Sequence, residues 1–220
     1  MKKIGLALLV MMLIMACGVV ATPVASTPSP GALPSLTPTI APTAFLPAPT
    51  LTLPAGQAVL VRSSQVVAAL QARDLSALAA LVHPNSGLRL SPHAFVSVSD
   101  LTFMPAELPG LLENPTLYDW GVYDGSGLPI TLTSEGYYTA FVYDQDYATA
   151  PQISLNQRLG VGNSLDNSRE FYPGAMVVEY YFAGFDPQFG GMDWRSLRLV
   201  FQLAGGEWYL VGIIHDQWSI

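Results

Sequence analysis

Residues 194–218, WRSLRLVFQLAGGEWYLVGIIHDQW, decide the fold. Two segments rich in alternating apolar residues flank Gly205 and Gly206, a pair that is typical of a tight hairpin turn. We therefore expect two long antiparallel strands, one on each side of this pair. The run 175–185 predicts a third antiparallel strand, which a loop connects to the hairpin.

The register of this hairpin follows from pairing Ala204 with Glu207 and counting outward. One face then carries mostly apolar pairs, and the other carries a more mixed set. At the open end, Arg195 is placed opposite Asp216 on the apolar face. Such a pair could bind a ligand carboxylate or hydroxyl, or it could be a structural ion pair that closes the sheet edge. The other pairs expected on the apolar face are Leu203–Trp208, Phe201–Leu210, Leu199–Gly212 and Leu197–Ile214. Those expected on the mixed face are Gln202–Tyr209, Val200–Val211, Arg198–Ile213 and Ser196–His215.

The segment after Pro54 has the spacing of helices. Its apolar residues predict one helix over residues 57–73. Asp74 is then a suitable N-cap for a second short helix, which ends before His83 and Pro84.

The middle of the chain predicts shorter elements. The chain becomes extended from Gly87, and prolines within residues 105–109 leave room for about one helical turn. Residues 118–124 predict a strand followed by a turn over residues 124–127. A further helix is expected to begin around Thr133.

Together these elements predict an α+β fold in which N-terminal helices pack on a curved, mainly antiparallel sheet. We expect one globular domain over residues 55–220. Its opening LQARDLSALAALVHP, residues 70–84, and its closing LRLVFQLAGGEWYLVGII, residues 197–214, resemble the first helices and last strands of the nuclear-transport-factor-like superfamily, a cone fold that includes ketosteroid isomerase. WGVYDGSGLPITL, FVYDQDYATAPQI and GMDWRSLRLVF are similar to a domain of uncharacterised bacterial lipoproteins that has no assigned activity.

The superfamily resemblance implies a pocket in the cone. In isomerases of this fold a carboxyl group in an apolar pocket is the base, and a tyrosine is an oxyanion donor. Asp216 would be that base, with Tyr123, Tyr138 or Tyr180 as the donor, and no motif selects among these tyrosines. Asp216 and Arg195 are thus the catalytic candidates. The candidate ligand-binding residues are Arg195, Asp216, Trp218 and Tyr180.

Residues 1–16 have the features of a secretory signal. Two lysines precede an apolar run that is too short to span a bilayer. The run ends in Ile14, Met15, Ala16 and Cys17, which resembles the bacterial lipobox. The resemblance implies a lipoprotein signal peptide that is cleaved before Cys17, a diacylglycerol thioether on Cys17, and a further acyl chain such as palmitate on the new amino group. An ordinary buried thiol is the alternative interpretation of Cys17.

Residues 17–54 are expected to form a lipidated, disordered tether. From position 18 onward this stretch has no ionisable side chain, and nine of its residues are proline. Without the signal peptide the protein has seven arginines against sixteen acidic residues, a net charge of −9. This charge excludes nucleic acid as a partner. It also indicates that the protein is attached to the membrane through lipid rather than through a basic patch.

No motif predicts a metal ion or a cofactor. The three histidines lack the paired spacing of metal ligands, and residues 160–164 lack the third glycine of a dinucleotide loop. We therefore expect a lipid-anchored protein on the extracytoplasmic side of the cell membrane, in which a non-catalytic module binds a small apolar or mixed ligand, or a cell-envelope partner, in the cone. The alternatives are an isomerase or dehydratase with a cone pocket, and a structural envelope module.

Overall fold

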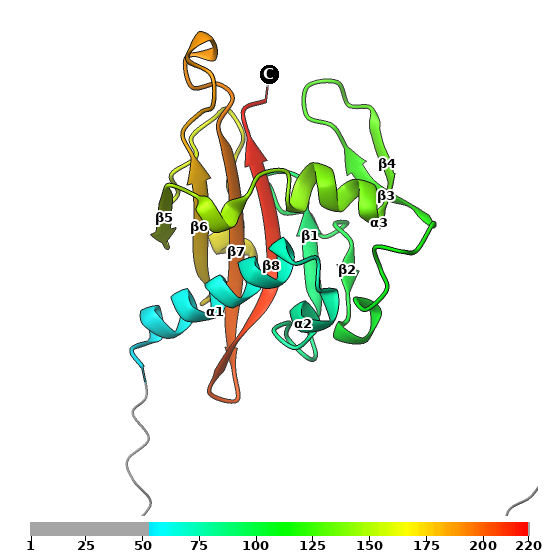
Figure 1. Ribbon diagram of the computed structural model, residues 1–220, viewed down its shortest axis with the longest axis vertical. Helices are drawn as coiled ribbons and strands as arrows, with labels where there is room; N and C mark the ends of the chain where they lie inside the picture. Colours follow the sequence, from blue (N-terminus) through cyan, green and yellow to red (C-terminus); the bar gives the residue numbers. More distant parts are fainter. Residues whose placement is uncertain (1–52, 220) are drawn as a thin grey trace, which may run out of the picture. The chain divides into compact units, whose positions relative to one another are not determined.

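Six strands of the computed structural model form one curved sheet, which Figure 1 shows from the side of the helix α1 (Ala55–Gln71). The structure describes residues 53–219, which belong to one unit spanning Thr50–Ile220. The signal peptide, Cys17 and nearly all of the tether lie outside the described residues. In spatial order the strands are β2 (Thr102–Phe103), β1 (Leu88–Ser91), β8 (Glu207–Gln217), β7 (Arg195–Ala204), β6 (Met176–Phe182) and β5 (Gln152–Leu155).

The sheet is mainly antiparallel, as predicted. The hairpin β7–β8 turns at Gly205 and Gly206, and β6 pairs with β7 as the expected third strand. The exception is β1, which pairs with β8 in the parallel sense. A separate two-stranded sheet consists of β3 (Leu117–Val122) and β4 (Pro129–Thr133), and β4 was not predicted.

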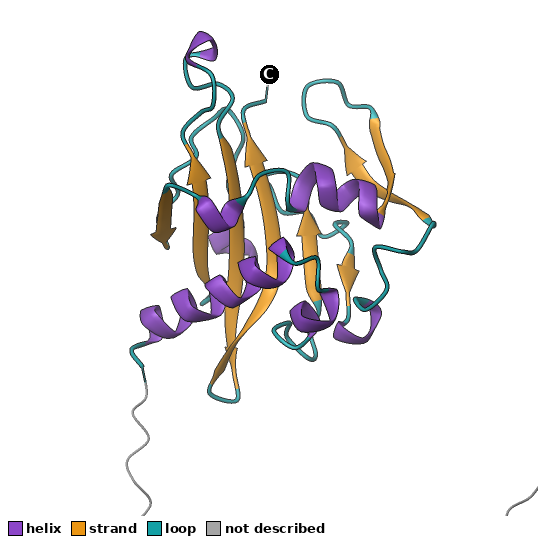
Figure 2. Cartoon of the chain, viewed as in Figure 1, coloured by secondary structure: helices purple, strands orange, loops and turns teal. Residues whose placement is uncertain are grey.

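Helices cover one face of the six-stranded sheet, which we call the inner face (Figure 2). The long helix α1 lies across it, and Asp74 caps α2 (Leu75–Ala79) as predicted, because its side chain accepts a hydrogen bond from the Ala77 N–H. Thr133 caps α3 (Ser134–Tyr137), which continues as a π-helix over Tyr138–Val142. Single 3-10 turns occupy Pro105–Glu107, Tyr147–Thr149 and Pro187–Phe189.

The inner face holds the main hydrophobic core. Alternate residues of β6, β7 and β8, among them Leu199, Phe201 and Ile213, are buried against the helices. The space left among the apolar side chains beside Leu70 and Ile213 is about 20 Å³. That volume holds about one water molecule. The core between helices and sheet is therefore packed, and this space is too small for a ligand of the kind that the cone resemblance implies.

The opposite, outer face is covered by residues 156–175, which include α4 (Ser168–Phe171). Tyr172 packs there with Val200, Val211 and Ile214 in a second hydrophobic cluster. The sheet is thus buried on both sides, which explains why β7 and β8 contain consecutive apolar residues instead of a clean alternation.

A β-bulge in β8 corrects the predicted register. The pairs agree with the prediction from Ala204–Glu207 to Phe201–Leu210, but the next pair is Val200 with Gly212, so that Val211 is an extra residue. An extra residue shifts every later partner by one position and changes the face on which it lies. Arg195 therefore pairs with Gln217 and lies on the inner face. Asp216 pairs with Ser196 and lies on the outer face, so the predicted Arg195–Asp216 pair is wrong.

Replacing Gly212 with alanine is expected to lower the free energy of unfolding by about 1–3 kcal/mol. The added Cβ would lie 2.8 Å from the Tyr172 hydroxyl oxygen and 3.4 Å from the Val200 Cβ. Urea denaturation measures the loss, and Tyr172→Phe should relieve part of it in the double variant. Gly136→Ala is the control, because its Cβ meets only ordinary contacts at 3.5 Å. Equal losses in the two glycine variants would contradict this account.

Candidate functional site

Four polar side chains lie on the outer face of three adjacent strands. Glu179 of β6 pairs with Arg198 of β7, and two residues along β7, Ser196 pairs with Asp216 of β8. All four are at most 2% exposed. The diagonals are bonded as well, since the Ser196 hydroxyl donates to Glu179 Oε1 at 2.6 Å and Arg198 Nη2 lies 3.5 Å from Asp216 Oδ2. Because alternate residues of a strand lie on the same face of the sheet, these buried polar side chains form one network.

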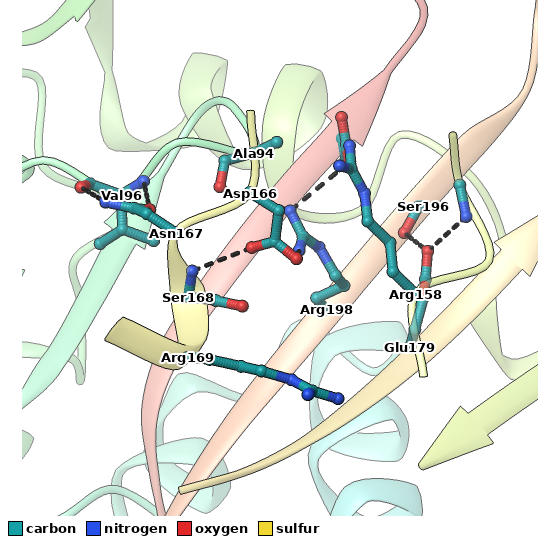
Figure 3. Close-up of polar contacts among 12 residues, drawn as sticks. Ala94, Val96, Arg158, Asp166, Asn167, Ser168, Arg169, Glu179, Ser196 and Arg198 are labelled. Atoms are coloured by element: carbon teal, nitrogen blue, oxygen red, sulfur yellow. Dashed lines mark hydrogen bonds and ion pairs between the residues drawn. The ribbon is translucent and has the colours of Figure 1, made fainter. Parts of the chain in front are cut away.

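The covering segment completes this network (Figure 3). Arg158 Nη2 lies 2.7 Å from Asp216 Oδ2, and Asp166 Oδ2 lies 2.7 Å from Arg198 Nη1. The backbone N–H groups of Leu159 and Gly160 donate to Glu179 at 2.6 and 2.9 Å. These contacts hold residues 158–166 against the sheet. Buried charges are stable only when they are paired and hydrogen-bonded in this way.

Gly160 also lets the segment approach the sheet closely. A Cβ at this position would lie 2.5 Å from the ring of Trp194. The glycines of residues 160–164 are thus explained by packing against Trp194. Further along the segment, the Asn167 side chain donates to the Val96 carbonyl and accepts from the Val96 N–H at 2.9 and 2.8 Å, which fixes the start of α4 (Figure 3).

A hollow of about 490 Å³ lies between this segment and the sheet, and we call it the arginine pocket. Pockets for small molecules have volumes of about 300–1,000 Å³. Three of the seven arginines of the described chain line it. Its lining residues are Asn156, Gln157, Arg158, Asp166, Ser168, Arg169, Tyr172, Gly174, Ala175, Val177, Glu179 and Arg198.

The hydrogen-bond acceptors around the pocket have more partners than the donors have. Each oxygen of Glu179 accepts a hydrogen bond, and Asp166 contacts the Ser168 N–H and Arg198. By contrast, the Nε atoms of Arg158 and Arg198 are buried without a hydrogen-bond partner in the described chain. The carboxylates of the lining are thus all bonded, whereas two buried arginine N–H groups beside them are not.

Asp166 remains an anion at neutral pH. Burial by itself raises the pKa of this carboxyl, but the Arg198 guanidinium and the hydrogen bonds from Ser168 outweigh that effect and hold the pKa below its usual value. The Asp166–Arg198 pair is thus formed at neutral pH.

A second polar group lies on the inner face around Asp144, just after the π-helix. Its Oδ2 atom lies 3.1 Å from Arg195 Nε and 3.4 Å from His215 Nε2, and its Oδ1 accepts a 2.7 Å hydrogen bond from the Tyr147 hydroxyl. Burial raises the pKa of Asp144, but the hydrogen bond and charge of His215, with help from Tyr147 and Arg195, bring the net pKa below its usual value. The true ion-pair partner of Arg195 is therefore Asp144.

The protein is expected to lose stability as the pH falls below about 4. The unfolded-state pKa of Asp144 and Asp166 is 3.8, and their folded pKa values are lower. Their contribution is therefore complete above the unfolded value and disappears as the pH falls through the folded values. Burial raises the pKa of Asp100, so Asp100 acts in the opposite sense.

Urea unfolding between pH 6 and pH 2.5 checks this expectation. Asp144→Asn and Asp166→Asn should each reduce the loss of stability below pH 4, because each removes one proton-binding group. A wild-type slope that neither variant changes would show that other groups cause the acid unfolding.

Two of the candidate tyrosines, Tyr138 and Tyr180, do not share a cavity with Asp216. The Tyr180 hydroxyl lies 2.9 Å from the Ser63 hydroxyl, between β6 and α1, and the Tyr138 hydroxyl donates to the Leu70 carbonyl. Both tyrosines are on the inner side of the sheet, whereas Asp216 is on its outer side. The base-and-tyrosine arrangement that the resemblance implied is therefore not formed by Tyr138 or Tyr180. Trp218 is 40% exposed.

Trp218 instead lines a separate pocket of about 180 Å³ at the open end of the hairpin. There His93 Nδ1 lies 3.4 Å from Asp124 Oδ2, and Tyr123 is partly exposed beside them. Asp216 also borders this pocket, but its carboxylate already contacts Arg158, Arg198 and Ser164.

The prediction missed Arg158, Asp166, Glu179 and Arg198 as site residues. A signal existed for two of them, since Glu179 and Arg198 interrupt apolar strands and a charge there needs a partner.

Within residues 53–219 there is no cluster of three side chains suited to a metal ion. No helix in that part of the chain is long and apolar enough to cross a membrane.

No protein-family model and no curated protein matches the chain. Among solved structures it is similar to a protein titled as a five-substitution variant of Rd1NTF2_05, with 12% identity and a TM-score of 0.31, over 72% of this chain and 96% of that chain.

Proposed function

We propose that this protein is an exported lipoprotein that carries a non-catalytic ligand-binding module, and that the arginine pocket is its ligand site. Cys17 anchors it to the extracytoplasmic side of the cell membrane. The observation that carries the proposal is a hollow of about 490 Å³ whose floor consists of buried, rigidly paired charges. The fold is proposed to be a variant of the nuclear-transport-factor-like cone, on the resemblance of its first helices and last strands.

Binding fits this pocket better than catalysis does. Glu179 is held by two backbone N–H groups and a hydroxyl, and Asp216 is held by two arginines. A group that abstracts a proton must be free to approach its substrate. Here the acidic side chains shape and stiffen the site, and a stiff site loses less entropy when a ligand binds.

The anchor has a direct test. Cells grown with radioactive palmitate should label the wild-type protein, and Cys17→Ala should remove the label while the protein is still made. Stable anchoring requires more than one acyl chain, so the alanine variant should also leave the membrane fraction. Equal labelling of the two proteins would contradict the lipoprotein assignment.

A bulky substitution at its rim tests whether the arginine pocket binds ligands. Gln157 lines the pocket and is exposed, so Gln157→Trp adds bulk at the rim without disturbing the core. We expect this variant to lose the compounds that the wild type binds in a small-molecule screen followed by nuclear magnetic resonance. Gln152→Trp is the matched control, because Gln152 is exposed on β5 and does not line the pocket. A screen in which Gln157→Trp keeps every compound would reject this site.

A second candidate function is docking of a cell-envelope protein. Residues 183–193 project beyond the strands β6 and β7 in Figure 1, and they expose Phe185, Phe189 and Met192 to about half of each side chain. Asp193 accepts hydrogen bonds from two backbone N–H groups of this loop and stiffens it. A photo-crosslinking residue at position 189, compared with one at the exposed Leu128, tests it. A discrete adduct at position 189 alone would support docking, and equal crosslinking at the two positions would reject it.

A further inference from the structure

We infer that the arginine pocket selects a small oxyanion, a molecule with a carboxylate or phosphate group, over neutral or cationic molecules. This inference rests on the proposed function and adds the chemical class of the ligand.

Arg169 is the first reason. Five of the seven arginines within residues 53–219 have a carboxylate partner, and the sixth, Arg89, donates to three backbone carbonyls. Arg169 makes a hydrogen bond only to the Asn156 carbonyl, and in Figure 3 its side chain extends past Arg198 without joining the ion-pair network. It thus offers an exposed guanidinium with free donors at the pocket wall.

The buried floor is the second reason. Arg198 is 1% exposed, and its Nε has no hydrogen-bond partner in the described chain; the same holds for Nε of Arg158. A buried donor without a partner is destabilising. A ligand that supplies acceptor oxygens complements the arginines of the lining, whereas a ligand that supplies donors meets carboxylates that are already bonded.

The charges around the pocket permit an anionic ligand. The charges of Arg158, Arg169 and Arg198 equal in number those of Asp166, Glu179 and Asp216, so the ligand-free site is close to neutral. The strongly negative protein therefore repels anions only at long range, where salt screens the repulsion. At short range the planar guanidinium of Arg169 matches two oxygens of one carboxylate or phosphate.

Calorimetric titration of the full-length protein in detergent tests the inference with four probes: inorganic phosphate, succinate, glucose and putrescine. We expect saturable binding of phosphate or succinate, and the tighter of the two identifies the oxyanion. Arg169→Gln should weaken that binding at least about tenfold, since it removes a charge-assisted contact. The control Arg73→Gln removes an exposed arginine that pairs with Glu135, away from the pocket, and should leave the affinity unchanged.

Three results would overturn the inference. If glucose or putrescine binds in preference to the anions and Gln157→Trp abolishes that binding, the pocket binds ligands but the chemical class is wrong, and the proposed function stands. If Arg169→Gln and Arg73→Gln weaken anion binding equally, the anions collect on the surface and not in the pocket. If none of the four probes binds at millimolar concentration, oxyanion selection is rejected, and the small-molecule screen alone then decides the proposed function.

Discussion

Arg198→Met is expected to lower the free energy of unfolding by about 3–5 kcal/mol. Its guanidinium is 1% exposed and bridges Asp166 and Asp216 across the outer face. Methionine fills a similar volume, so little of the loss is a packing effect. The loss arises because Asp166 loses its cationic partner, and because Asp216, which is itself buried, keeps only Arg158.

Urea unfolding at pH 7 measures this loss. Arg169→Met is the matched control, because Arg169 lines the same pocket but is exposed and has no carboxylate partner; its effect should stay within about 0.5 kcal/mol. At pH 3 the Arg198 variant should lose less relative to the wild type than it does at pH 7, because Asp166, without the arginine that lowers its pKa, is then closer to protonation. Equal stability of the two variants at pH 7 would show that the buried ion pairs do not hold the covering segment.

Phe201→Ala is also expected to lower the free energy of unfolding by about 3–5 kcal/mol. Phe201 is completely buried on the inner face, within the main hydrophobic core. A packed core cannot collapse around a missing ring without moving the neighbouring elements, so most of the new cavity should persist.

Leu203→Ala is the control for this experiment. Leu203 lies two residues further along β7 on the same face, but it is 57% exposed near the turn. We expect a loss of about 0.5 kcal/mol or less. If Phe201→Ala cost no more than Leu203→Ala, the inner face would have to be loosely packed.

Much of the fold could be predicted because its signals are local. Glycine at positions 205 and 206 indicates the turn, Asp74 and Thr133 act as helix caps, and the spacing of apolar residues indicates α1. Each of these signals depends on neighbours in the sequence. The predicted α+β class and the mainly antiparallel sheet are confirmed for the same reason.

The site could not be predicted in the same way, because it depends on one extra residue. Up to Phe201–Leu210 the pairing follows from counting, but the bulge at Val211 has no strong local signal in an apolar strand. Counting past it places Asp216 on the wrong face. The partners Arg158 and Asp166 come from an irregular segment, and no periodicity determines the course of such a segment.

The position of β8 in the sheet also bears on when the chain can fold. This strand is the last of the described elements, yet it lies between β1 and β7, and its partners in β1 are more than a hundred residues earlier in the sequence. Until β8 has emerged, α1 and β1 have no completed sheet on which to pack, and folding that depends on such distant contacts is slow. The export that we propose would benefit from this order, because a chain that lacks its last strand would stay unfolded, and thus translocation-competent, during its passage.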